Sequence, residues 1–154
     1  MSRRSFALVL VCACLIMPVR PGLAQTPDKA YPIFTETHLD AMMKTLGPNV
    51  AGVRRALADR DFERAKERAI RSREQLATTI TFWRDRQRPD AVGWLRAALT
   101  QLDHLDTELS AEEPDVITLD AIASELGQTC VACHTVYREP DDQGGYRVNY
   151  SALR

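Results

Sequence analysis

The chain has 154 residues, of which 45% are hydrophobic and 27% are charged, and its net charge is −1. This composition is typical of one ordinary globular domain and excludes a disordered or collagen-like chain. Its 20 basic and 21 acidic residues leave no excess of positive charge, so we expect no nucleic-acid partner.

The first 24 residues differ in composition from the rest. Two arginines precede an apolar run of 14 residues, 6–19, and small residues follow at Gly22 and Ala24. The run is shorter than the roughly 20 residues that span a bilayer, and the whole pattern is that of a secretory signal peptide. We therefore predict cleavage after residue 24 and a periplasmic protein without a membrane anchor. An uncleaved anchor is the alternative.

Cleavage leaves 130 residues with a net charge of −4 and two of the four cysteines, Cys130 and Cys133. So few cysteines exclude a disulfide scaffold. We assign residues 25–140 to one folded domain. The last residues, 141–154, have no hydrophobic period and are predicted to form a flexible C-terminal tail.

Apolar residues recur at intervals of three and four along four segments, which predicts four helices at about 35–58, 62–86, 90–109 and 115–138. Pro48 interrupts the first of them and predicts a kink or a restart there. Short connections force antiparallel neighbours, so the expected fold is all-α, an up-down-up-down four-helix bundle. The predicted inward positions are Leu39, Met43, Leu46, Val50, Val53, Leu57, Phe62, Ala65, Ala69, Leu76, Ile80, Trp83, Leu95, Leu99, Leu102, Leu105, Leu109, Leu119, Ile122, Leu126, Cys130, Cys133 and Tyr137.

Near the end of the fourth segment the chain reads Cys130-Val131-Ala132-Cys133-His134. This is the spacing at which c-type haem is attached. At about 100° per helical residue, the two thiols and the imidazole lie on the same face of the helix. Both cysteines can form thioethers with the haem vinyl groups, and His134 can be the proximal iron ligand. The sequence therefore predicts one covalent haem c.

Three other interpretations of the motif are weaker. A thioredoxin-like dithiol follows a strand in a βαβ pattern and does not need the histidine. A zinc site needs a fourth ligand, and His38 and His104 are the other histidines of the chain. A chance match without any cofactor is the third interpretation.

The motif continues with Thr135, Val136, Tyr137 and Arg138, and in this form it resembles the class II c-type cytochromes, the cytochrome c′ family. That family carries CxxCH on its last helix and commonly follows it with Tyr-Arg. The resemblance covers about residues 33–140, and it extends to a Met-Lys pair with a glycine four residues after the methionine, here Met43, Lys44 and Gly47.

The resemblance implies a four-helix bundle with one haem and places Tyr137 and Arg138 beside it. It also makes a homodimer plausible. This chain departs from the family at Leu39, where an arginine is common. The resemblance therefore provides no anchor for a haem propionate at that position.

Antiparallel neighbours bring the start of the first helix beside the end of the fourth, so Met43 is expected to lie near His134. A buried thioether suits haem iron, and we predict Met43 as its sixth ligand. Met42 is the second choice, and a methionine that merely fills the core is the alternative. The sequence thus predicts a one-electron carrier that serves redox partner proteins and is not an enzyme. A five-coordinate haem that binds small gases such as NO or CO is the other interpretation.

Overall fold

The computed structural model describes residues 35–154, so the predicted signal peptide, 1–24, lies outside the described residues. An all-α fold class is confirmed for the described part, which also contains one minor two-stranded sheet. The elements are, in chain order, α1 (Glu36–Ala58), α2 (Phe62–Thr78), α3 (Ile80–Asp85), α4 (Pro89–Glu108), α5 (Val116–Tyr137), β1 (Arg138–Pro140), β2 (Tyr146–Val148) and the 3-10 helix η1 (Tyr150–Leu153).

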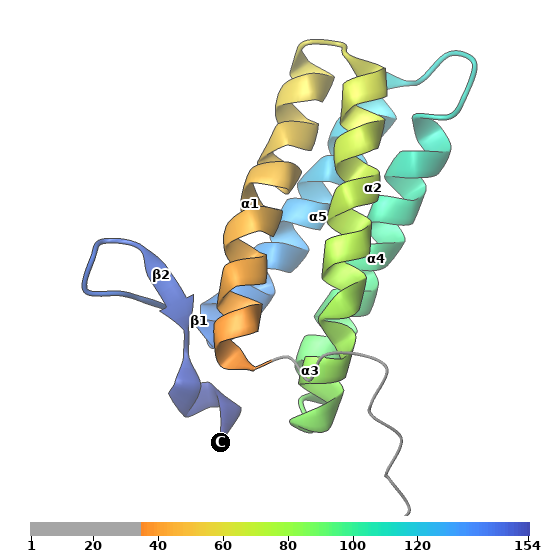
Figure 1. Cartoon of the computed structure of the whole chain (residues 1–154). Helices are drawn as coiled ribbons and strands as arrows, with labels where there is room; N and C mark the ends of the chain where they lie inside the picture. Colours follow the sequence, from red (N-terminus) through yellow and green to blue (C-terminus); the bar gives the residue numbers. More distant parts are fainter. Residues whose placement is uncertain (1–34) are drawn as a thin grey trace, which may run out of the picture. The chain divides into compact units, whose positions relative to one another are not determined.

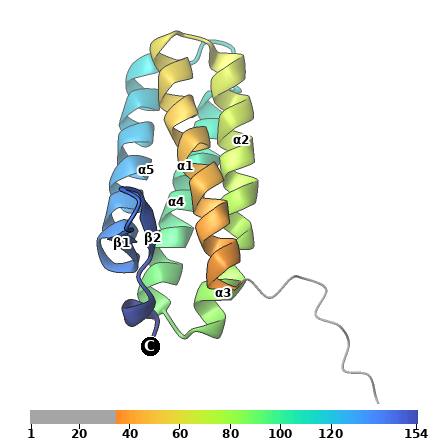
Figure 2. The same ribbon diagram turned by 60° about the vertical axis from the view of Figure 1, so that its left-hand side comes forward.

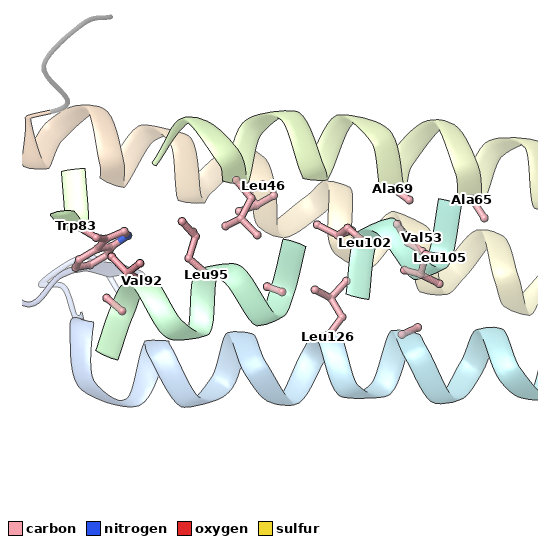
Figure 3. Packing of buried hydrophobic residues seen from close by; sticks show 14 of the residues in the cluster. Leu46, Val53, Ala65, Ala69, Trp83, Val92, Leu95, Leu102, Leu105 and Leu126 are labelled. Atoms are coloured by element: carbon pink, nitrogen blue, oxygen red, sulfur yellow. The ribbon is translucent and has the colours of Figure 1, made fainter. Parts of the chain in front are cut away.

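The four long helices lie side by side, as Figure 1 and Figure 2 show from two directions. α1 packs against α2, α2 against α4, and α4 against α5, while α5 also contacts α1. The core lies between them, and Figure 3 shows Leu46, Leu102 and Leu126 reaching into it from α1, α4 and α5. Every predicted inward position is buried or packs against this core. Burial of each large aliphatic side chain contributes about 1.5–3 kcal/mol.

Polar side chains fix where three of the helices begin. Thr35, Asp61 and Asp115 are the N-caps of α1, α2 and α5, and each accepts a hydrogen bond from a backbone N–H of the first turn. Such a cap satisfies a donor that has no partner inside the helix. α4 instead begins with Pro89, which has no backbone N–H and therefore no donor that needs a partner in the first turn.

The second predicted helix, 62–86, is divided at Thr79 into α2 and α3. Thr78 and Thr79 donate their hydroxyls to the carbonyls of Gln75 and Leu76 at 2.7 and 2.8 Å. Such bonds compete with the helical ladder, and β-branched side chains tolerate a helix interior less well. The spacing of apolar residues continues across this break, because Ile80 and Trp83 still pack in the core.

Pro48 lies inside α1, which runs unbroken from residue 36 to residue 58. The tail differs more from its expectation. Instead of a segment without regular structure, residues 138–148 form an antiparallel hairpin in which Glu139 pairs with Arg147. Asp141 shapes its turn by accepting the N–H groups of Gln143 and Gly145 at 2.9 and 2.7 Å. Gly144 adopts the left-handed conformation with φ 77°, which glycine adopts without strain.

By length and composition alone, α5 is apolar enough to cross a membrane; no other helix of residues 35–154 passes that test. Core helices of folded domains pass it too. Leu119, Ala123 and Leu126 of α5 are buried against the other helices. We therefore describe α5 as part of the folded unit.

Candidate functional site

A cavity of about 770 Å³ opens between α1, α4, α5 and the hairpin. Its volume lies in the range of cofactor pockets, about 300–1,000 Å³. Most of the side chains around it are apolar. All six residues predicted to form the site line this one cavity, namely Met43, Cys130, Cys133, His134, Tyr137 and Arg138.

α5 forms the first wall of the cavity with about the last three turns of its length. Cys130 and Cys133 are half-buried and free, and both contact the core. His134 is half-buried beside them. α5 runs without a break from Val116 to Tyr137, so the helix is continuous through the motif. A regular helix presents two thiols and an imidazole to the same cavity, as attachment of one flat macrocycle requires.

α1 forms a second wall, in which Leu39, Met43 and Leu46 are apolar. Figure 2 shows that the first turns of α1 and the last turns of α5 lie at the same end of the helical unit. Gly47 on α1 and Gly127 on α5 both line the cavity, and a Cβ built on either would meet no atom within 4 Å. The missing side chains thus leave open space between the two helices, where a larger residue would reduce the cavity.

Burial controls the protonation of the motif. It raises the pKa of Cys130, and it raises the pKa of Cys133 to about 12, with smaller contributions from Cys130 and Asp90. These thiols are therefore protonated at neutral pH, unlike the low-pKa thiolate of a thioredoxin-like dithiol. Burial, helped by Arg138, lowers the pKa of His134. The imidazole is neutral at pH 7, and the neutral form is the one that binds a metal.

Tyr137 lines the cavity at the end of α5 and contacts residues of α3 and α4. Its hydroxyl donates to the carboxylate of Asp90, with oxygen distances of 2.9 and 3.0 Å. Burial and this hydrogen bond raise the pKa of Tyr137 to about 12, so the phenol stays protonated. Its ring lies 4.7 Å from that of Trp83 and 6.4 Å from that of Trp94. Both tryptophans also line the cavity.

Other candidates from the sequence lie elsewhere. His38 and His104 are exposed and do not line the cavity, and Met42 is half-buried but also lies outside its lining. Within residues 35–154, no three His, Cys, Asp or Glu side chains are grouped so that they could hold a metal ion. The zinc interpretation of the motif thus gains no further ligands.

Sequence reasoning missed the hairpin, which contributes Gly145, Tyr146, Arg147 and Val148 to the cavity. A signal was present in the turn-forming run Asp141-Asp142-Gln143-Gly144-Gly145, with Tyr146 and Val148 two residues apart after it. Aspartate and glycine clusters between short apolar segments favour hairpin turns.

Comparison with known proteins adds no relative. No protein-family model matches the chain, and no curated protein or solved structure matches it either.

Proposed function

We propose that this chain is an exported monohaem c-type cytochrome that carries single electrons between redox partner proteins, in the periplasm, and is not an enzyme. The observation that carries this proposal is the shared cavity of Cys130, Cys133 and His134 on α5 with Met43 on α1. The proposal includes an up-down-up-down four-helix bundle of the cytochrome c′ type, which agrees with the side-by-side packing of the long helices.

In this proposal the residues of α5 hold the haem. Cys130 and Cys133 form thioethers, which prevent its loss by dilution after export, and His134 provides the proximal nitrogen. When bound, the haem supplies an iron that takes up and releases one electron. Met43 offers a soft thioether as sixth ligand, and such His/Met ligation raises the reduction potential.

The remaining residues of the cavity exclude water and orient the group. Trp83, Trp94 and Leu95 form an apolar surface from α3 and α4. Tyr137 is held by Asp90 and packs between the two tryptophans, so the end of α5 has a fixed position. A site that stays dry and rigid in both redox states reduces the reorganisation that accompanies electron transfer.

One absorption experiment tests the electron-carrier proposal. The full chain is expressed in a host with haem-attachment machinery, and spectra are recorded for the oxidised, reduced and CO-treated protein. We expect sharp low-spin bands that do not change with CO, because both axial positions are filled. A broad high-spin spectrum with CO uptake would instead establish the five-coordinate, gas-binding function, and a colourless protein would contradict haem binding altogether.

A further inference from the structure

Among the charged residues that line the cavity, basic residues outnumber acidic residues. Asp40 is the acidic residue among the lining side chains. Basic residues come from α1, from the end of α5 and from the hairpin, and they are Lys44, Arg54, Arg138 and Arg147. Because all of these basic residues are exposed while the deeper lining is apolar, the positive charge lies at the edge that meets solvent. This edge suits an apolar ligand that carries carboxylates at one side.

A c-type haem is such a ligand, because its two propionates are carboxylates on a hydrophobic ring. The position at which an arginine is common in the resembling family is occupied here by Leu39, which is 1% exposed. A buried leucine cannot pair with a carboxylate. If a propionate has an ionic partner in this protein, that partner lies elsewhere in the lining of the cavity.

Arg147 is the lining cation that is paired with a residue of the opposite hairpin strand. Its Nε donates to Oε1 of Glu139 at 2.8 Å, and the two residues are directly paired in the hairpin. The neighbouring Val148 is 6% exposed, and Asn149 donates its backbone N–H to the carbonyl of Tyr137 at 2.9 Å. These contacts fix β2 against the end of α5. Since the contact with Glu139 uses Nε, both terminal nitrogens of Arg147 are left for another carboxylate.

The other cations are engaged differently or not held at all. Lys44 pairs with Asp40 at 2.7 Å, and Arg138 stacks on the ring of Tyr146 at 4.1 Å. Arg54 is exposed on α1, and no hydrogen bond or ion pair of the described residues fixes its guanidinium. An arginine that is already oriented loses less side-chain entropy when it binds a carboxylate.

We propose that the C-terminal hairpin is part of the haem site and that Arg147 binds a haem propionate there. This inference rests on the proposed function. In this arrangement the hairpin serves as a strap at the cavity edge, and the Glu139–Arg147 pair sets the direction of the guanidinium. Arg147 binds the propionate directly and adds positive charge next to the haem, and Glu139 is the positioning residue.

The test compares Arg147→Gln, Arg147→Lys and Arg54→Gln, each in the full chain with haem attached, with Arg96→Gln as the control. Arg96 is exposed on α4 and does not line the cavity. The readouts are the midpoint reduction potential and the denatured mass, which reports covalent haem. Loss of positive charge disfavours the reduced form, which holds the extra electron.

We expect Arg147→Gln to keep its covalent haem and to lower the potential, with a reduction equilibrium about two- to fivefold less favourable, the scale of one partly exposed charge pair. Arg147→Lys should restore most of the potential. Arg54→Gln should lower it less than Arg147→Gln does, because the guanidinium of Arg54 is not held by an ion pair, and the Arg96→Gln control should leave it unchanged. A wild-type chain without covalent haem would overturn the proposed function itself. A haem-loaded Arg147→Gln variant with the wild-type potential would overturn this inference alone, and so would a fall confined to Arg54→Gln.

Discussion

At the scale of single residues, Met43 decides between the two candidate haem functions. Its side chain on α1 is half-buried, packs against the hydrophobic core and lines the same cavity as His134. The adjacent Met42 does not line it. The two methionines thus form a natural pair of test and control, because they differ by one step along the helix and have the same chemistry.

We expect Met43→Leu to remove the sixth ligand while keeping the core filled, since leucine and methionine have similar volumes. The haem should become five-coordinate, with a high-spin spectrum and uptake of CO. Met42→Leu should keep the wild-type spectrum. Absorption spectra of both variants with and without CO provide the measurement, and an unchanged low-spin spectrum of Met43→Leu would show that this sulfur is not a ligand.

The sequence could identify the residues of the motif because their chemistry is local. The three residues Cys130, Cys133 and His134 lie within five consecutive positions, so they share one face of the helix. The partner of Tyr137 was not predictable in this way, since Asp90 lies 47 residues earlier on another helix. Contacts of this kind depend on how the helices pack, and the spacing along one helix contains no information about them.

At the scale of the helices, α5 combines the CxxCH motif with a buried stripe. Leu119 is fully buried, whereas Ile117 on the same helix is 81% exposed. We expect Leu119→Ala to lower the free energy of unfolding by about 2–5 kcal/mol, because it removes buried surface and leaves a cavity. Ile117→Ala should change it by less than about 0.5 kcal/mol. Urea unfolding of the two variants gives both values, and equal losses would contradict the packing of α5.

The start of α5 predicts a dependence of stability on pH. Hydrogen bonds from Thr118 and Ile117 lower the pKa of Asp115 below its ordinary value of 3.8. The stabilisation from this cap is therefore fully present above the ordinary value and is lost as the pH falls through the lower pKa of the folded state. Asp115→Asn keeps a capping oxygen without the titration.

We expect the melting temperature of the wild-type chain to fall more steeply below about pH 4 than that of Asp115→Asn. Thermal unfolding followed by circular dichroism between neutral and acidic pH gives the comparison. Parallel curves for the two proteins would show that the Asp115 carboxylate does not contribute to the cap. His134 lies in the last turn of the same helix, far from Asp115. The absorption spectrum of the proposed haem should therefore be the same in the two proteins, and it serves as an internal reference.

The helices were predictable because their apolar spacing is regular, and α1, α4 and α5 begin and end within a few residues of the predicted positions. The break at Thr79 was not, since the threonine hydroxyls compete with the helical ladder without disturbing that spacing. The hairpin after Tyr137 was also missed. Its strands have three residues each, too few for a recognisable period.

At the scale of the whole molecule, helices and the hairpin line the same open cavity, with contributions from both ends of the described chain. α1 begins at residue 36 and β2 ends at residue 148, and these two elements contact each other. A chain shortened before the hairpin would therefore lose part of the cavity lining while it keeps the motif. The proposed site belongs to the whole folded unit and not to the CxxCH segment alone.

We propose that a haem is bound covalently through Cys130 and Cys133. The full chain, expressed with haem-attachment machinery and secreted, is denatured and its mass is measured beside that of a Cys130→Ala, Cys133→Ala double variant. We expect the wild-type polypeptide to keep the mass of one haem after denaturation and the double variant to lack it. A wild-type polypeptide at its bare mass, secreted by a host that attaches haem to a control cytochrome, would contradict covalent attachment of haem.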